Sequence, residues 1–321
     1  MSTTSNTSAT HAVFQGSTVL VTGAAGFIGG HLLHALKKLG ANIVAVDRKP
    51  STGIHGTDVA DADQLHKIFS LSTATFGKTP EFIFHLAGQK SASIARENPA
   101  ETLKTTFDST INILESSRKI GSVKKVVLIS SLAVYGLDED NSIALLKESD
   151  PIHNDSIYSA TKIATEALGL SYCKDFGLPV SIARLSNVYG PGQSAAAIIP
   201  SLITQMKSPV TEEQKISIGN TQSIRDFIHV NDVVEALIQI AASNATTSRV
   251  FNVSTAQGTS IQKIIELLSN VLNYHGEIVI DRHKVRENEK KSLIADNSEI
   301  KKTTGWSPLV KIEDGLKNLC Q

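Results

Sequence analysis

The chain has 321 residues, of which 41% are hydrophobic and 19% charged, so it can bury a sizeable core and is not globally disordered. Its 31 Lys and Arg residues balance its 31 Asp and Glu residues, and this charge gives no reason to expect a nucleic acid or a membrane surface as a partner. Its two cysteines, Cys173 and Cys320, have neither metal-ligand nor disulfide spacing. We therefore expect no metal site and a reducing compartment, by default the cytoplasm.

The beginning of the chain differs from the rest in composition. Residues 1–15 are rich in Ser, Thr and Asn and have neither a basic start nor an apolar core, which predicts a flexible tail and not a signal peptide. No apolar run approaches the roughly 18–20 residues that a membrane-spanning helix requires. We therefore expect no membrane partner.

Short apolar runs alternate with longer amphipathic stretches through the first half of the chain. The pattern predicts strands at 17–22, 42–47, 81–86, 123–130 and 179–185. It predicts helices at 27–39, 61–70, 99–119 and 157–176. Most strands are apolar on both faces, which is typical of a parallel sheet covered by helices on both sides. The predicted fold class is therefore α/β, with a doubly wound parallel sheet of the Rossmann type.

The pattern loosens after about residue 185, where three prolines interrupt it. Strands are predicted at 227–230, 251–253 and 277–281, and helices at 231–242, 261–272 and 312–319. We expect residues 16–185 to form a dinucleotide-binding domain that residues 225–255 rejoin. Residues 186–321 are expected to form a smaller, interwoven α/β substrate-binding lobe.

A glycine-rich stretch, T-G-A-A-G-F-I-G at 22–29, joins the first predicted strand to the first helix. Its three glycines suit a tight turn, a close approach to a pyrophosphate and close packing of helix on strand. The helix start adds free N–H groups and the positive end of its dipole. An ordinary tight turn is the alternative, but the context favours a dinucleotide site. Its predicted contacts are Gly23, Ala25, Gly26, Phe27, Ile28 and Gly29.

Acidic residues follow the next two strand regions. Asp47 ends the second strand, where a carboxylate can accept hydrogen bonds from an adenosine ribose and would repel a 2′-phosphate. It favours NAD over NADP, although the basic residues that follow, Arg48 among them, could instead accommodate that phosphate. Asp58, with Val59 beside it, could bind the adenine. The alternative is that Asp58 or Asp61 caps a helix.

Tyr158 and Lys162 lie four residues apart in Y-S-A-T-K, on one face of the predicted helix at 157–176. The pKa of a free tyrosine is about 10, so the phenol is a poor base near neutral pH. We expect the Lys162 ammonium to lower that pKa, so that Tyr158 can take a proton from a sugar or alcohol hydroxyl. The motif also occurs by chance, with an exposed lysine beside a half-buried tyrosine.

Six stretches of the chain, taken in order, form a more specific pattern. They are T-G-A-A-G-F-I-G (22–29), H-L-A-G (85–88), S-S-L-A-V-Y-G (130–136), Y-S-A-T-K (158–162), R-L-S-N-V-Y-G-P-G (184–192) and R-D-F-I-H-V-N-D-V (225–233). Over residues 17–319 the chain resembles the extended short-chain dehydrogenase/reductases, in particular their nucleotide-sugar epimerase/dehydratase branch. The resemblance implies that Ser131 is a catalytic hydroxyl, Tyr158 the general base and acid, and Lys162 the residue that binds the nicotinamide ribose.

The resemblance also implies contacts to cofactor and substrate. Leu86, Ala87 and Gly88 match cofactor-binding positions, and His85 is expected to belong to the scaffold. H-L-A-G-Q-K looks like a stretch of the UDP-galactose 4-epimerases, with Lys90 matching their lysine near the cofactor and the substrate. A nucleotide-diphosphate sugar and a homodimer built on the helices at 99–119 and 157–176 are the implied partners.

Two further residues match positions that hold the sugar nucleotide, Asn187 and Arg225, with Arg225 at the diphosphate. A guanidinium fork suits phosphate oxygens. Arg286 is a second candidate for a phosphate clamp. The alternative is that the D-R-H-K-V-R run containing Arg286 forms a solvated charged face.

The residues after Ser131 bear on the reaction. The 4,6-dehydratases of the family carry an Asp-Glu pair there, whereas Leu132 and Ala133 in this chain cannot transfer a proton. We therefore expect neither dehydration nor the related decarboxylation, but 4-epimerisation of a UDP-hexose through transient oxidation by bound NAD. One alternative is an NAD(P)H-dependent NDP-4-keto-6-deoxyhexose reductase. Others are an oxidoreductase acting on steroids or other alcohols, and a non-catalytic dinucleotide-binding regulator.

Overall fold

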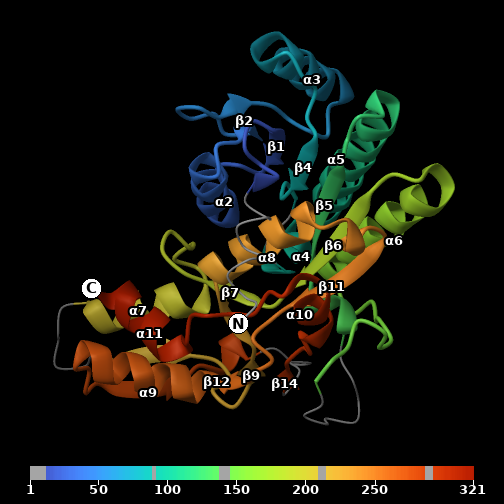
Figure 1. The fold of residues 1–321 in the computed structure, drawn as a ribbon. Coiled ribbons are helices and arrows are strands. Elements are labelled where there is room, and N and C mark those ends of the chain that lie inside the picture. The colour runs from blue at the N-terminus through green and yellow to red at the C-terminus, as the bar shows by residue number, and fades with distance from the viewer. Residues whose placement is uncertain (1–11, 89–91, 137–144, 209–214, 286–291) are drawn as a thin grey trace.

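The computed structural model of the protein describes residues 12–88, 92–136, 145–208, 215–285 and 292–321. Seven parallel strands form its central sheet, and their order reverses between β1 and β4 (Figure 1). This order, with parallel pairing throughout, confirms the doubly wound α/β fold. From one edge to the other the strands are β11 (Arg249–Val253), β6 (Val180–Leu185), β5 (Lys125–Ser131), β4 (Phe82–His85), β1 (Thr18–Thr22), β2 (Asn42–Asp47) and β3 (His55–Gly56).

Both faces of the sheet are buried, which explains why the strands are almost continuously apolar. On β1, Val19 and Val21 belong to one hydrophobic cluster, and Leu20 between them belongs to another. Val127 on β5 faces the first cluster, and its neighbour Val126 faces the second. Alternate side chains of a strand point to opposite faces, so each strand contributes to two cores at once.

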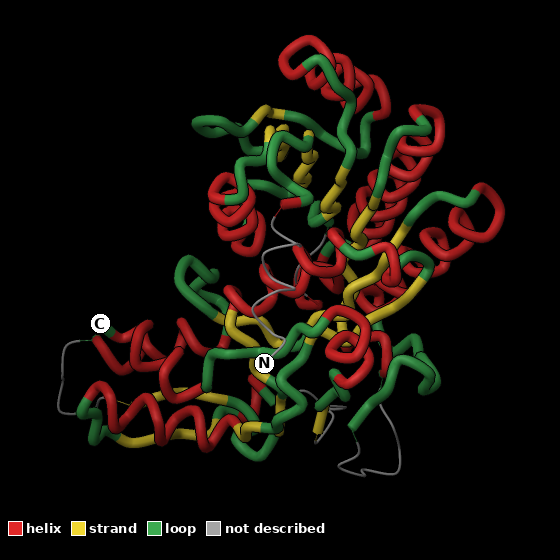
Figure 2. Tube along the Cα trace, viewed as in Figure 1, coloured by secondary structure: helices red, strands yellow, loops and turns green. Residues whose placement is uncertain are grey.

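Helices cover the two faces of the sheet (Figures 1 and 2). On one face lie α2 (Phe27–Lys38) and α8 (Val230–Ala242), and on the other lie α3 (Ala62–Phe76), α5 (Pro99–Ile120) and α6 (Ile157–Phe176). The ends of α6 coincide with those predicted. Ser156 and Ser159 form a capping box at its start, and Gly177 ends it in the left-handed conformation at φ +64°.

A smaller part of the molecule lies at the carboxyl edge of the sheet and has a core of its own (Figure 1). Its helices are α7 (Ile198–Lys207), α9 (Ile261–Leu272) and α11 (Ile312–Cys320). Its strands form three small sheets: β7 (Asn187–Tyr189) with β10 (Phe227–His229), β8 (Lys215–Ile218) with β13 (Glu277–Ile280), and β9 (Ile224–Arg225) between β12 (Thr259–Ser260) and β14 (Ser292–Leu293). The remaining elements are α4 (Ala92–Glu97), α10 (Ser298–Thr304), η1 (Leu132–Tyr135), η2 (Asn244–Thr246) and η3 (Arg282–Lys284).

Two expectations need correction. The tail predicted over residues 1–15 extends too far, because Phe14 is fully buried and its ring centroid lies 4.9 Å from that of Phe82. Within the segment predicted to rejoin the sheet domain, the strand at 227–230 does not join the central sheet, because β10 pairs with β7; only β11 returns to it, beside β6. Among the short strands of the small sheets, β10 and β13 were predicted; β7, β8, β9, β12 and β14 were not, since two to four residues carry too little periodicity.

Candidate active site

The carboxyl ends of the central strands meet at one edge of the sheet. Thr22 at the end of β1 pairs with His85 at the end of β4, and Ser131 at the end of β5 pairs with Leu185 at the end of β6. In a doubly wound sheet, ligands bind at this edge, where the strand order reverses. The predicted site residues that follow these strands are therefore brought to one side of the molecule.

The glycine-rich loop lies directly against the segment after β4. Gly23 has φ +67°, and a Cβ there would stand 2.8 Å from the backbone of Leu86 and Ala87. The Ala87 N–H donates to Thr22 Oγ1 at 3.1 Å, which fixes this approach. A Cβ on Gly29 would collide with the Gly23 carbonyl oxygen. Both positions therefore require glycine, and the Leu86–Gly88 segment passes beside the loop.

The N-terminus of α2 is open to a ligand. Gly26 is its N-cap residue, and no side chain caps the helix. Free N–H groups and the positive end of the helix dipole at such a terminus suit a pyrophosphate. Phe27 and Ile28, in the first turn, are half-buried, and the Phe27 ring lies 5.7 Å from that of His31. This geometry fits the dinucleotide that the sequence predicts.

Asp47 is held against the same loop. Its Oδ2 accepts from the Ala25 N–H at 3.2 Å and its Oδ1 from the Lys49 N–H at 3.0 Å. The carboxylate therefore stands at the end of β2, beside the loop, where an adenosine ribose would be bound. Arg48 points elsewhere, with its guanidinium 3.8 Å from the exposed carboxylate of Glu101 on α5.

Asp58 and Val59 follow the edge strand β3. Asp58 Oδ1 accepts from the Ala60 N–H at 3.0 Å, and the Asp58 N–H donates to Gln64 Oε1 at 2.9 Å. Asp61, and not Asp58, caps α3. The Val59 side chain is in the hydrophobic core, so only its backbone could reach a ligand.

Ser131, Tyr158 and Lys162 lie together. A hydrogen bond joins Ser131 to the Tyr158 hydroxyl. Lys162 Nζ lies 5.8 Å from the centroid of the Tyr158 ring and donates to the Ile129 carbonyl at 3.1 Å. An ammonium has three donors. Lys162 is only 8% exposed, so little solvent reaches its other donors.

The pKa of Tyr158 differs from the expectation. Burial raises it above its ordinary value, and the hydrogen bond from Ser131 opposes this only in part. Burial likewise lowers the pKa of Lys162 to about 8, against the attraction of Glu166. In the chain alone, the pKa of Tyr158 is therefore raised despite the nearby Lys162, because desolvation disfavours both charges. Positive charge from a bound ligand would be needed to favour the phenolate.

His85 contributes to the frame of the site. Its Nδ1 lies 2.8 Å from Thr22 Oγ1, and burial together with the Lys162 charge lowers its pKa to about 3. The imidazole is therefore neutral at physiological pH. This position, at the end of β4, agrees with the structural role expected from the sequence.

Asn187 and Arg225 approach the site from the smaller part of the molecule. Asn187 pairs with Phe227 across β7 and β10, two residues from Arg225, and its N–H donates to the Asp226 carbonyl at 2.9 Å. Asn187 is exposed and Arg225 half-buried. The buried Asp226 carboxylate accepts from the N–H groups of Thr255 and Ala256 and fixes this junction. Lys90 and Arg286 lie outside the described residues.

Two groups of the site were missed in the sequence. Glu166, one turn after Lys162 on α6, is 3% exposed and binds Arg184. Glu166 is a charged residue on a helix that is expected to be covered on two faces, and this signal could have indicated a buried ion pair. Thr106 on α5 lies near Gly88, and its buried hydroxyl has no hydrogen-bond partner among the described residues; no motif marked it.

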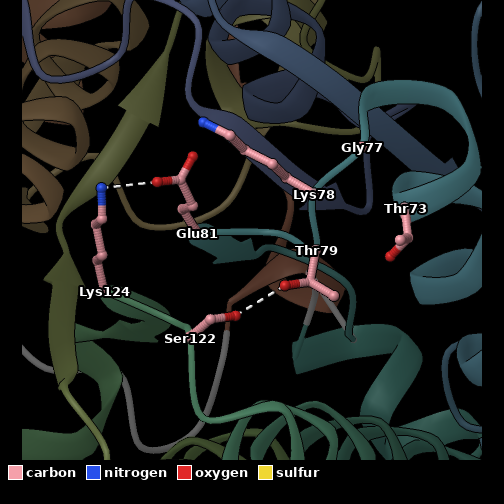
Figure 3. A pocket seen from close by; sticks show the side chains of 7 residues that line it. All are labelled: Thr73, Gly77, Lys78, Thr79, Glu81, Ser122 and Lys124. Atoms are coloured by element: carbon pink, nitrogen blue, oxygen red, sulfur yellow. Dashed lines mark hydrogen bonds and ion pairs between the residues drawn. The ribbon is translucent and has the colours of Figure 1, made fainter.

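A pocket described in the structure lies away from this site. A hollow of about 470 Å³ lies where β4 and β5 begin, at the opposite edge of the sheet; Lys78, Thr79, Glu81, Ser122 and Lys124 are among the residues that line it (Figure 3). Within the described ranges no cluster of three metal-ligating side chains occurs. No helix in the part of the chain that the structure describes is both long and apolar enough to span a bilayer.

Comparison with known proteins agrees with this geometry. GDP-6-deoxy-D-mannose reductase of Pseudomonas aeruginosa is 30% identical over 305 residues, covering 93% of this chain and 94% of the relative. The structure of UDP-glucose 4-epimerase from Thermotoga maritima with UDP-glucose superposes with a TM-score of 0.83 at 28% identity, covering 94% and 96% of the two chains. RMD from Pseudomonas aeruginosa, complexed with NADPH, gives 0.82 at 28% identity, covering 95% and 97%.

These similarities extend over nearly the whole chain and include both an epimerase and a reductase of nucleotide sugars. A family model described as the NAD dependent epimerase/dehydratase family matches residues 19–254. That range contains the glycine-rich loop, Asp47 and the cluster of Ser131, Tyr158 and Lys162. The chain therefore belongs to the NAD-dependent epimerase/dehydratase family, whose members act with a nicotinamide dinucleotide.

Proposed function

We propose that the protein is a 4-epimerase of a UDP-hexose that works with a tightly held NAD. One observation carries the proposal: Ser131, Tyr158 and Lys162 converge beside the glycine-rich loop, and no second acid–base pair follows Ser131. Leu132 is buried and apolar, and Ala133 contributes its N–H to Ser131 Oγ at 3.2 Å. The described residues can therefore move one hydroxyl proton, and the two positions after Ser131 provide no acid–base pair for expelling water.

The proposed roles follow from the contacts. Ser131 orients the sugar 4-oxygen, and Tyr158 takes the 4-hydroxyl proton as the carbon loses its hydrogen. When bound, NAD supplies the hydride acceptor and a positive charge near Tyr158. Lys162 holds the nicotinamide ribose and adds its own charge. Both charges favour the phenolate and so offset the burial that raises the pKa of Tyr158 in the chain alone. Tyr158 returns the proton after the keto sugar has presented its other face.

The binding residues divide between the two parts of the molecule. We assign the dinucleotide to residues 16–185 with 225–255, and the sugar nucleotide to residues 186–321. Asn187 and Arg225 are proposed to hold the diphosphate side of the substrate. Lys90 and Arg286 keep their proposed roles near the cofactor and the phosphates. A homodimer through α5 and α6 remains part of the proposal.

NAD is proposed in preference to NADP. The support is Asp47, whose carboxylate stands beside the glycine-rich loop and would repel a 2′-phosphate. Arg48 is turned toward Glu101, so its charge is partly neutralised there. Both features favour a ribose without a phosphate.

A second candidate is the reduction of an NDP-4-keto-6-deoxyhexose. It is favoured by the 30% identity to a GDP-6-deoxy-D-mannose reductase and by the similarity to RMD, whose complex contains NADPH. Reduction requires the same Ser131, Tyr158 and Lys162, with the hydride delivered once.

The two candidates can be separated with one panel of substrates. The purified protein is offered UDP-, dTDP-, GDP- and CDP-hexoses without added cofactor, and separately the 4-keto-6-deoxy sugars with NADH or NADPH. Interconversion of UDP-galactose and UDP-glucose over many turnovers supports epimerisation. Consumption of one NAD(P)H for each keto sugar, without such interconversion, would establish the reductase instead.

A further inference from the structure

A buried ion pair lies directly behind the proposed catalytic residues. Arg184 on β6 binds Glu166 on α6 through two parallel hydrogen bonds, Nε to Oε1 at 2.9 Å and Nη2 to Oε2 at 2.7 Å. Both side chains are about 5% exposed or less. Glu166 Oε1 also accepts from Ser130 Oγ at 2.5 Å. Glu166 therefore connects the residue before Ser131 with the helix that carries Lys162 and Tyr158.

The pair continues into a longer chain of buried hydrogen bonds. Arg184 Nη1 donates to the Tyr135 hydroxyl at 2.9 Å, and this hydroxyl donates to Asn252 Oδ1 at 2.7 Å. The Asn252 N–H donates to Glu148 Oε1 at 2.7 Å, and its Nδ2 to the Leu146 carbonyl at 2.9 Å. This series of hydrogen bonds thus connects η1, which follows Ser131, with β6, β11 and the segment near residue 148.

A charge pair in this position needs an explanation. Two buried charges lose hydration, and a pair of apolar side chains in their place is often neutral or stabilising. General stability is therefore a weak reason for the pair. Its contacts reach both elements that carry Ser131, Tyr158 and Lys162, namely β5 and α6, and also η1, which follows Ser131.

We propose that the Glu166–Arg184 pair is a positioning device that aligns Ser131 with Tyr158 and Lys162 and fixes the net charge behind Lys162. The inference rests on the proposed roles of these three residues. Neither Glu166 nor Arg184 touches the reacting atoms; both act through their neighbours. With the pair intact, the negative charge one turn from Lys162 is matched by a positive charge on the far side.

Among the described residues, Glu166 is the charged group that acts on Lys162, so the pair influences its electrostatics. Tyr158 faces it from the same helix, and the neutral His85 faces it from β4. Glu166 raises the pKa of Lys162, against the burial that lowers it to about 8. Arg184 from β6 reaches this environment through Glu166. Loss of either member of the pair therefore changes the local charge, in opposite directions.

The test measures the ionisation of Tyr158 in the NAD-loaded protein. The phenolate is followed by its ultraviolet absorbance as pH rises, for each variant with and without Tyr158→Phe, and the difference reports Tyr158 alone. Glu166→Gln leaves a positive charge and should lower the apparent pKa of Tyr158. Arg184→Met leaves a negative charge and should raise it. Each shift is expected to be on the order of half to one pH unit.

Two further variants sharpen the test. The double variant Glu166→Gln/Arg184→Met removes both charges and should return the pKa of Tyr158 close to that of the parent. If Arg184→Met alone does not fold, the pKa of Tyr158 in the double variant is compared with that in Glu166→Gln, and this comparison gives the effect of removing Arg184. Glu299→Gln breaks a half-exposed pair with Arg249 near α10 and should leave the titration unchanged.

The outcomes separate this proposal from the proposed reaction, because the titration needs no sugar. Opposite shifts with recovery in the double variant support the positioning device, even in a protein that epimerises nothing. Shifts of the same sign in the two single variants, or no recovery in the double variant, would show that the pair only maintains the fold.

Discussion

Lys162 Nζ lies 5.8 Å from the centre of the Tyr158 ring, and both side chains extend from the first turns of α6 into the carboxyl edge of the sheet. Lys162 is held there by a hydrogen bond to the Ile129 carbonyl at 3.1 Å. The strand β5 therefore fixes the ammonium, and α6 fixes the phenol. The chemistry of the site therefore depends on the charges around the Tyr158 hydroxyl.

Replacing Tyr158 by Phe should abolish most turnover while leaving the fold and cofactor binding intact. The phenol is the proposed proton carrier, and loss of a general base lowers turnover by about 10²–10⁴-fold. Steady-state assays and the retained nicotinamide in the purified variant measure both effects. Tyr172→Phe is the matched control, because Tyr172 lies on the same helix but bonds Glu115. Near-normal turnover in Tyr158→Phe would exclude the mechanism.

Burial of Lys162 should make the stability of the cofactor-free protein depend on pH. Its pKa is lowered from 10.5 to about 8 because burial penalises the ammonium. Between pH 8 and 10.5 the unfolded chain retains a proton that the folded chain has lost, so the free energy of unfolding rises with pH. Relative to Lys162→Met, the wild type should gain on the order of a few kcal/mol across this window.

Denaturant titrations of both proteins at a series of pH values provide that measurement. Lys125→Met is the matched control, because burial lowers the pKa of Lys125 to about 8 as well, but Lys125 begins β5 at the opposite edge of the sheet. The free energy of unfolding of the wild type relative to Lys125→Met should rise over the same pH range. The NAD affinity of Lys125→Met should not change. A free energy of unfolding of the wild type that stays constant or falls relative to that of Lys162→Met between pH 8 and 10.5 would contradict the burial of Lys162.

Gly29→Ala should weaken NAD binding by at least about tenfold. The added Cβ would stand 2.9 Å from the Ala24 Cα and collide with the Gly23 carbonyl, so the loop must shift away from the pyrophosphate. Gly30→Ala is a close control, since a Cβ at the next position meets nothing within 4 Å. It should retain NAD affinity and stabilise α2 by about 0.5–1 kcal/mol. Equal affinities of the two variants, by fluorescence titration, would place the dinucleotide elsewhere.

Asp47→Asn should lower NAD affinity by roughly tenfold or more, because a hydrogen bond to a charged group contributes about 1.5–3 kcal/mol. The affinity for NADP should fall less than that for NAD, or should rise, because the charge that repels the 2′-phosphate is removed. Dissociation constants for the two cofactors measure the ratio. Asp63→Asn, in the first turn of α3, is the matched control. An unchanged ratio in Asp47→Asn would remove Asp47 from cofactor selection.

Periodicity predicted the sheet and the long helices because strands buried on both faces appear as apolar runs, and helix ends appear as capping residues, in a single sequence. The two ends of α6 illustrate this, since Ser156 and Gly177 are local features that a single sequence displays. The register that places Ser131 opposite Leu185 depends on contacts distant in sequence and could only be inferred from fold class. The raised pKa of Tyr158 could not be predicted, because burial depends on packing around the helix.

The Glu166–Arg184 pair shows a further limit of the sequence. Arg184 stood in a stretch that was recognised, yet no role was assigned to it, since its partner is 18 residues away on another element. Phe14 was missed for a similar reason: the polar residues around it indicated a tail, whereas its burial follows from packing against the rings of Phe82 and Phe84, which are distant in sequence.

The most direct test of the central claim uses UDP-galactose labelled with deuterium at C4, without added cofactor. If Tyr158 takes the 4-hydroxyl proton while the C4 hydrogen is stored within the site and returned, UDP-glucose should form over many turnovers with the deuterium retained at C4. Product that carries solvent hydrogen at C4, or no UDP-glucose from protein that contains bound NAD, would contradict the account.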